Sequence, residues 1–271
     1  IRECNAIAHV VRCFDDDNIV HVDGSVDPLR DSEVIDTELG LADLASVEKR
    51  MNRTSKMARS GDKDARADME ILEPLLAHLN EGKPVRSMEL ADDQRLRISD
   101  MHLLTDKPVM YLANISEADA VNPDANPHVQ KLKEAVAGAP VICMSAAIEA
   151  EISQLEEEEQ REYLESLGLS ESGLDKVIRE GYKLLDLITY LTAGPKETRA
   201  WTVKRGSSAP EAAGVIHTDF QRGFIKAEVI KFDDFVSLGS EVAVKAAGKL
   251  RIEGKEYTVV DGDVMHFRFN V

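Results

Sequence analysis

The sequence predicts an α/β protein in which a parallel sheet, interrupted by a helical hairpin, is followed by a small α+β domain. Three short, almost continuously apolar segments predict central strands covered on both faces: Ala6–Phe14, Val109–Ile115 and Pro140–Ala146. Between the first two strands, apolar residues recur at helical spacing over two long stretches. From about Leu184 the period changes to two, which is typical of strands with one solvated face.

Helices are expected between and after the strands. Residues 127–138 begin with Pro and end with Gly, the usual asymmetry of a helix, and with their flanking strands they form a βαβ unit. A second helix is predicted over residues 92–104 and a third, continuous one over residues 147–168. The four consecutive glutamates Glu156–Glu159 on that third helix are interpreted as a solvated face.

The helical hairpin is predicted over residues 35–60 and 64–81. Ser60-Gly61-Asp62 interrupts the two apolar patterns, and Gly82 with Pro84 ends the second. The pattern favours a coiled coil. Two interpretations stay open, an arm that binds a partner and an ordinary pair of surface helices.

The C-terminal domain is predicted to be a β-grasp, the ubiquitin-like arrangement of strands around one helix. Ile225, Ala227 and Val229 alternate with the charged Lys226 and Glu228, and Met265, Phe267, Phe269 and Val271 alternate with polar residues. Ser207–Gly214 contains a cap residue, Pro and Glu in the order of a helix start.

Composition limits the possible functions. The 271 residues carry a net charge of −17, yet residues 184–271 hold 12 basic and 12 acidic residues, so contact with RNA phosphate is more plausible there. No apolar run is long enough for a membrane span. The three cysteines are scattered, which indicates neither a zinc site nor disulfides and fits a reducing cytoplasm. We predict no metal ligands in this chain.

The first residues predict that the natural protein has an upstream segment. Ile1–Cys4 contains no Met and no cap residue, and it resembles the tail of a helix leading directly into a strand. We therefore expect a segment before Ile1.

Polar residues end two of the predicted strands. In an open parallel sheet, ligands bind at the carboxyl ends of the strands, where Asn114 and Ser145 would lie on one rim. The Asn114 amide can donate and accept, and Ser145-Ala146-Ala147 offers backbone N–H groups and little bulk to a flat base. The alternative is that Asn114 is a turn residue and Ser145 a helix cap.

The segment Asn114-Ile115-Ser116-Glu117 favours adenine over guanine. Guanine-binding proteins carry Asn-Lys-x-Asp after such a strand, and here Ile115 replaces the Lys and Glu117 the Asp. Guanine's ring N–H and 2-amino group need a well-placed carboxylate, whereas adenine has no 2-amino group. The Asn114 side chain and backbone groups near Ile115 could meet adenine's 6-amino group and N7, so ATP is the predicted ligand.

Hydrolysis of a nucleoside triphosphate needs phosphate-binding and magnesium-binding motifs that this sequence lacks. It contains no G-x-x-x-x-G-K-[ST] and no evident magnesium-binding acid after a strand. The chain as printed could hold a base but could not hydrolyse a triphosphate.

Long strings of the sequence resemble the YchF / Obg-like ATPase family of P-loop proteins without its N-terminal part. They are IRECNAIAHVVRCF, IDTELGLADLASVEKR, NISE, MSAAIEAEI, AGPKETRAWTVKRGSSAPEAAGVIHTDFQRGFIKAEVI and DGDVMHFRFNV. The last two resemble the family's C-terminal TGS domain. The expected upstream segment would be roughly 90 residues, enough for a P-loop, switch segments and two or three strands.

The resemblance implies a domain plan and a function. Residues 1–34 and 100–183 would form a partial P-loop (G-type) nucleotide-binding domain, 35–99 a coiled-coil insertion and 184–271 the TGS domain. The implied protein is a cytoplasmic, monomeric ATPase that uses GTP poorly and binds the large ribosomal subunit or its rRNA through the TGS domain and arm. The residues that would bind ATP are Asn114, Ile115, Glu117, Ser145 and Ala146. Mg²⁺ would be held by the missing segment.

His21 is the catalytic residue that the resemblance implies. Members of the family lack the water-orienting Gln of Ras-like proteins, and a histidine on a mobile loop is thought to replace it; the matching position is His21, in FDDDNIVHVDG. A histidine can orient or deprotonate water near neutral pH. Without the resemblance, an exposed loop histidine would be the simpler interpretation.

Two other functions remain as alternatives. The chain could be a non-catalytic ribosome- or protein-binding adaptor that acts through the arm and the C-terminal domain. An unrelated α/β metabolic enzyme has little support, because no acid–base or nucleophile set converges.

Overall fold

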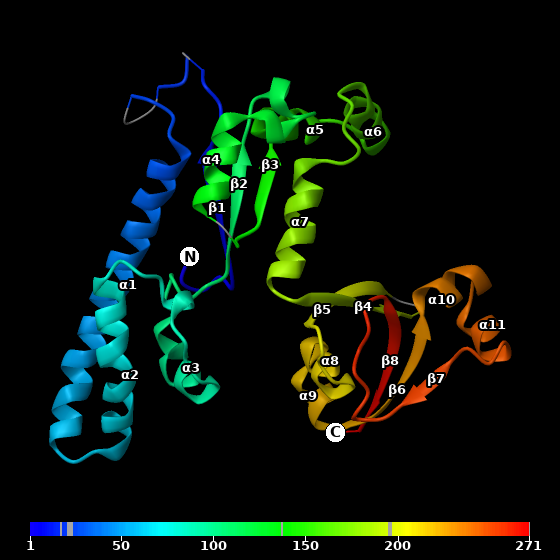
Figure 1. The fold of residues 1–271 in the computed structure, drawn as a ribbon. Helices are drawn as coiled ribbons and strands as arrows, with labels where there is room; N and C mark the ends of the chain where they lie inside the picture. Colours follow the sequence, from blue (N-terminus) through cyan, green and yellow to red (C-terminus); the bar gives the residue numbers. More distant parts are fainter. Residues whose placement is uncertain (17, 21–23, 137, 195–196, 271) are drawn as a thin grey trace. The chain divides into compact units, whose positions relative to one another are not determined.

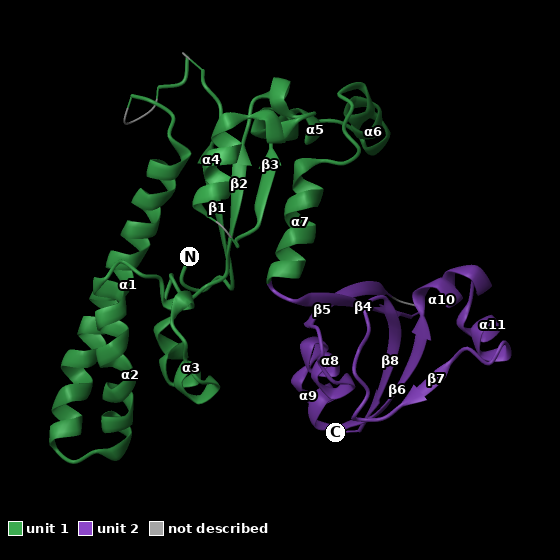
Figure 2. Cartoon of the chain, viewed as in Figure 1, with its two compact units in different colours: residues 1–184 green, residues 185–271 purple. Residues whose placement is uncertain are grey.

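The computed structural model describes residues 1–16, 18–20, 24–136, 138–194 and 197–270. The chain divides into two compact units, Ile1–Leu184 and Leu185–Val271 (Figures 1 and 2).

The first unit is built on a parallel sheet in the order β1-β2-β3. Its strands are β1 (Ile7–Arg12), β2 (Val109–Asn114) and β3 (Val141–Met144). Helix α4 (Pro127–Ala135) contributes Val129 and Leu132 to the core on one face, and α7 (Gly173–Leu184) packs on the other. β2 is buried along almost its whole length because it has a helix on each face.

Strand β1 differs from the prediction of a strand covered on both faces. Val11 is buried against the core under α4, but Val10, which points to the opposite face, is 62% exposed. β1 pairs only with β2 among the described residues, so its other edge is open. Continuous apolar sequence indicated a buried strand, and in this chain nothing described covers the second face.

The helical hairpin consists of α1 (Pro28–Arg59) and α2 (Lys63–Asn80), and it packs around its own core of buried Val47, Leu72 and Leu75 (Figure 1). Each helix begins after an Asp cap, Asp27 or Asp62, whose carboxylate accepts from first-turn N–H groups. α1 therefore starts seven residues before the expected position 35. Coiled-coil packing stays a prediction.

Two expected helices have different bounds. The helix predicted over 92–104 is α3 (Asp92–Ile98), followed by the 3₁₀ turn η2 (Ser99–Met101). The continuous helix over 147–168 was wrong: the chain forms α5 (Ala146–Ile152) and α6 (Glu157–Ser166). The cause is the N-cap Glu156, whose backbone N–H is accepted by Glu159, so that the acidic run forms a favourable first turn instead of a mid-helix face. Three more 3₁₀ turns are η1 (Val85–Ser87), η3 (Glu117–Asp119) and η4 (Pro123–Ala125).

The second unit is a five-stranded mixed sheet in the order β5-β4-β8-β6-β7. Its strands are β4 (Leu187–Ala193), β5 (Thr198–Lys204), β6 (Phe224–Lys231), β7 (Arg251–Glu253) and β8 (Asp263–Phe269), and its helices are α8 (Ala209–Ile216), α9 (Thr218–Arg222), α10 (Phe232–Leu238) and α11 (Glu241–Ala246). The central pair β4 and β8 is parallel, and α8 fills the core. The buried Tyr190 hydroxyl donates to the carbonyl of Ala212 in α8 at 2.8 Å.

The predicted helix start in this unit is confirmed, whereas two positions expected inside, Ile225 and Phe269, are exposed. Ser208 is the N-cap of α8, and Glu211 accepts its N–H at 2.7 Å. Ile225 was expected inside, but it is 56% exposed because the register shifts between Phe224 and Lys226. Such a bulge changes which residues face inward, so Phe224 is buried instead.

A buried carboxylate joins the hairpin to the sheet. Asp43 in α1 is fully buried and accepts from the backbone N–H groups of Leu104 (2.9 Å) and Thr105 (2.7 Å), and from the Thr105 hydroxyl (2.9 Å). Arg2 donates to the same carboxylate at 3.2 Å. Leu104 and Thr105 lie just before β2, so this one side chain fixes where the chain enters the central strand.

Replacing Asp43 with Asn should lower the free energy of unfolding of the first unit by about 2–4 kcal/mol, because an amide N–H₂ would face donors in a buried site. Urea denaturation followed by circular dichroism measures the change. Glu48→Gln, on an exposed position of the same helix, is the matched control and should stay within about 0.5 kcal/mol. Equal effects of the two variants would show that Asp43 does not hold the joint.

Candidate functional site

The rim of the first sheet brings the predicted site residues Asn114, Ser145 and Ala146 together. Asn114 ends β2 opposite Met144 of β3, and Ser145 follows directly. The Asn114 Oδ1 atom accepts the backbone N–H of Ala146 at 3.0 Å. The tips of the two loops are therefore joined by one hydrogen bond.

This bond changes the role of Ser145. Ser145 occupies the N-cap position of α5, but its side chain makes no capping hydrogen bond and is buried. Asn114 caps the helix from the neighbouring strand instead. Its Nδ2 atom has no protein partner among the described residues, which leaves two amide N–H groups able to donate to a ligand.

Ile115 is buried, whereas Glu117 is exposed. Ile115 is 3% exposed in the core under α4, and its N–H donates to the Met144 carbonyl at 2.9 Å. The N–H of Ile115 is therefore already used. The backbone group of this residue that remains available to adenine is its carbonyl. Glu117 is exposed in the 3₁₀ turn η3.

Asn126 is an organising residue that the sequence analysis missed. Its side chain caps α4 by accepting from His128 N–H (2.8 Å) and Val129 N–H (3.2 Å). Its Nδ2 donates to the Cys13 carbonyl at 2.9 Å and to Asp119 at 3.0 Å. Ser116 also donates to Asp119, at 2.7 Å, so one network connects the ends of β1 and β2 with the start of α4. The Asn-Pro pair before the helix was the available signal.

Glu149 and Gly173 hold the start of α7 close to strand β3, which leads to the rim. The Glu149 carboxylate accepts the N–H groups of Gly173 (2.6 Å) and Leu174 (3.1 Å) at the start of α7. A Cβ at Gly173 would lie 2.6 Å from the Met144 Cβ and 2.8 Å from Glu149 Oε1. Only glycine allows this approach, which holds α7 against the strand that leads to Ser145.

Arg12 shapes the loop that follows β1. It pairs in register with Asn114, and its guanidinium donates to the carbonyls of Phe14 (3.0 Å), Ile19 (3.0 Å) and Asp16 (3.3 Å). The predicted catalytic residue, His21, lies outside the described residues. The structure therefore places the base of its loop beside Asn114 and gives no position for the imidazole.

Metal ligands are not gathered at this rim in the described part of the chain. A group of three potential ligands that lie close together, Glu228, Glu241 and His266, is in the second unit. There the Glu228 carboxylate is already bound by Arg268, at 3.2 Å. Among the described residues, no helix is both long and apolar enough to cross a membrane.

Known proteins resemble this chain over its whole length. It is 52% identical to the Bacillus subtilis "Ribosome-binding ATPase YchF" across 100% of this chain and 75% of the relative. The chain belongs to the YchF / Obg-like ATPase family. The Escherichia coli O157:H7 protein of the same name is 50% identical over 74% of its length, and the rat "Obg-like ATPase 1" is 44% identical over 69%.

Structure and a family model agree with this assignment. The solved "Structure of the Schizosaccharomyces pombe YchF GTPase" matches 98% of this chain and 73% of that chain, with a TM-score of 0.82 and 37% identity. Residues 187–270 match the YchF-GTPase_C family model, described as "Protein of unknown function (DUF933)". The predicted fold class is confirmed for this YchF-family chain.

Proposed function

We propose that this YchF-family chain is the greater part of a ribosome-binding ATPase that prefers ATP to GTP. The observation that carries the proposal is the bond between Asn114 Oδ1 and Ala146 N–H, which holds two loop tips together at the carboxyl ends of neighbouring strands. The names of its relatives, ribosome-binding ATPases, support the activity and the partner.

The adenine preference follows from the groups available at the rim. Asn114 Nδ2 can donate to a ring nitrogen of the base, while Oδ1 keeps a second lone pair for the 6-amino group. Ile115 points into the core, so no cation stands where guanine-binding proteins place Lys. Exposed Glu117 and the small Ala146 complete the pocket in this proposal, and Ser145 positions the loop.

Residues 1–34 and 100–183 form the nucleotide-binding domain in this proposal, 35–99 the helical insertion and 184–271 the TGS domain. The phosphate-binding loop, the Mg²⁺ ligands and further strands would come from a segment outside the printed residues. The open edge of β1 and the exposed Val10 offer such strands a place to pair and pack. Bound Mg²⁺ would neutralise charge on the phosphates. The printed chain alone is expected to be inactive.

Replacing Asn114 with Asp tests the base site. The carboxylate keeps an acceptor for Ala146 N–H but loses the donor, so in a protein extended to include the phosphate-binding segment ATP should bind about tenfold more weakly or worse. Fluorescent-nucleotide titration measures this, and ATP should bind more tightly than GTP before the change. Asn122→Asp, an exposed side chain without a capping bond, is the control. An unchanged affinity for ATP would show that Asn114 is not part of the base pocket.

Replacing His21 with Ala tests catalysis separately from binding. If this side chain orients the attacking water, turnover in the extended protein should fall about 100-fold or more while ATP affinity is kept. Steady-state phosphate release gives the rate, and His266→Ala, an exposed histidine of the second unit, is the matched control. A variant with normal turnover would rule out the role of His21.

The ribosome contact is proposed to use the TGS domain, together with the helical arm, on the large subunit or its rRNA. Residues 184–271 are electrically neutral, whereas the rest carries the whole −17 charge, so phosphate repulsion is least there. Such a protein would work as a monomer in the cytoplasm.

Deleting residues 185–271 from the extended protein should abolish co-sedimentation with ribosomes and leave ATP binding intact. The deletion follows the boundary between the two compact units, so the first unit should stay folded, which circular dichroism can check. Undiminished co-sedimentation would assign the contact to the arm. Ribosome binding without turnover in the extended protein would favour the non-catalytic adaptor.

A further inference from the structure

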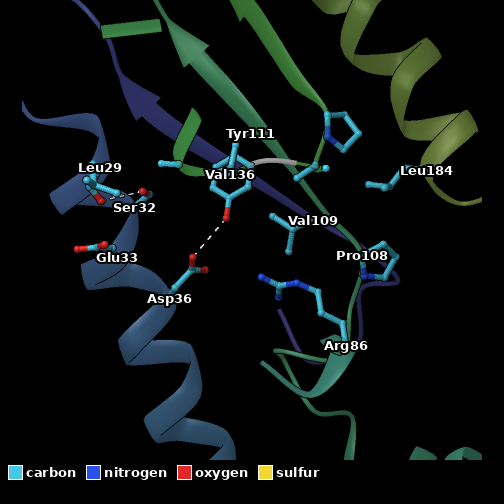
Figure 3. Close-up of a pocket in the computed structure, with 14 residues that line it drawn as sticks. Leu29, Ser32, Glu33, Asp36, Arg86, Pro108, Val109, Tyr111, Val136 and Leu184 are labelled. Atoms are coloured by element: carbon cyan, nitrogen blue, oxygen red, sulfur yellow. Dashed lines mark hydrogen bonds between the residues drawn. The ribbon is translucent and has the colours of Figure 1, made fainter. Parts of the chain in front are cut away.

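A second cavity lies at the opposite end of the first sheet from Asn114. It encloses about 520 Å³ and is formed by the start of α1, the end of α4 and the residues that lead into β2 and β3 (Figure 3). This volume is within the ~300–1,000 Å³ typical of small-molecule sites. Pro108 and Pro140, just before the two strands, mark it as the amino end of the sheet.

Side chains of opposite charge line this cavity. Asp36 from α1 and Arg86 from η1 project into it from two sides, yet they form no ion pair with each other or with any other described residue (Figure 3). Arg86 donates through Nη1 to the Thr105 carbonyl at 3.3 Å, which leaves its other N–H groups available. An unpaired carboxylate and an unpaired guanidinium in one cavity are complementary to a ligand carrying both charges.

Tyr111 sets the geometry of the anionic side. Its hydroxyl donates to Asp36 Oδ2 at 3.3 Å across the gap between β2 and α1. Burial, followed by the nearby Asp36 charge, raises the pKa of Tyr111 to about 12, so the phenol remains a donor at neutral pH. One carboxylate oxygen is therefore held by Tyr111 and the other is left to accept from a ligand cation.

Part of the cavity wall is apolar. Leu29, Val109, Val136 and Leu184 line it, together with the two prolines. A ligand with only charged groups would leave this surface in contact with water, whereas an aliphatic side chain would cover it. The remaining acid, Glu33, is exposed at the cavity and adds to its attraction for an ammonium group.

We propose that this cavity binds a free α-amino acid with an apolar side chain, its ammonium on Asp36 and its carboxylate on Arg86. The apolar side chain packs against Val109 and Val136. The site uses none of the residues at the nucleotide rim, so this proposal is independent of the ATPase proposal. Because its walls come from both the hairpin and the sheet, the bound amino acid stabilises their junction.

Titration calorimetry with ligand analogues tests the two charges separately on the 271-residue chain. Valine, leucine, isoleucine, methionine and phenylalanine, all in the L form, identify the best side chain. For leucine, the zwitterion should bind at least about tenfold more tightly than either leucinamide, which lacks the carboxylate, or N-acetyl-leucine, which lacks the ammonium. Each analogue keeps one of the two charge-assisted contacts.

Variants of the cavity should give a reciprocal pattern. Asp36→Asn should weaken leucine and leucinamide about tenfold and spare N-acetyl-leucine, whereas Arg86→Gln should weaken leucine and N-acetyl-leucine and spare leucinamide. Arg86→Lys, which keeps the charge, should retain part of the carboxylate binding. Lys131→Gln and Glu134→Gln, on the exposed face of α4, are controls that should change nothing. Circular dichroism confirms that each variant is folded.

Three results would overturn the proposal. The first is the absence of saturable binding of all five amino acids up to about 10 mM. The second is equal affinity for leucine and its two analogues. The third is a loss of binding that is the same for all three ligands in both variants, which would indicate a general disturbance of the cavity instead of recognition of two charges.

Discussion

The first unit depends on the burial of strand β2. It is hydrogen-bonded to β1 on one edge and β3 on the other, and helices cover both its faces. A shift of one residue would exchange the side chains packed under α4 with those packed under α7, so the fit of each set to its helix fixes the register. That register brings Asn114 to the rim at one end and Val109 and Tyr111 to the cavity at the other. Both proposed sites are therefore positioned by the same strand.

Polar groups tie the hairpin to the segment that leads into this strand. Asp43 holds the backbone of Leu104 and Thr105, and the Thr105 hydroxyl accepts the N–H of Val85 at 3.1 Å. Val85 directly precedes Arg86 in the chain. The buried carboxylate thus orders, in two steps, the turn that carries the guanidinium of the second cavity. A buried charge is costly, and here four donors compensate it.

The sequence allowed the strands, the hairpin and the mixed second unit to be predicted, because the central strands are short and continuously apolar while the other two parts keep a consistent hydrophobic period. It failed where a single polar contact decides the local structure. Glu159 begins a new helix by accepting from Glu156, and the bulge after Phe224 turns Ile225 outward; neither disturbs the surrounding period enough to be seen. Ser145 occupies the cap position of α5, but the capping bond comes from Asn114, which lies 32 positions before the Ala146 N–H that it accepts. The cavity at Asp36 and Arg86 escaped for the same reason, since its two charges are 50 residues apart.

The packing of Ile115 gives the proposed adenine preference a structural basis beyond the absence of a lysine at this position. Its side chain is 3% exposed and belongs to the core that α4 and β2 share, and its N–H is fixed by Met144. Introducing Lys at this position would bury an ammonium group next to Val129 and Leu132, at a cost of several kcal/mol unless the helix moved. Converting this site into a guanine-type pocket would therefore require changes in the core as well as at the rim. On the proposed function, base choice rests on Asn114, whose position is set by the strand pairing and by the N–H of Ala146.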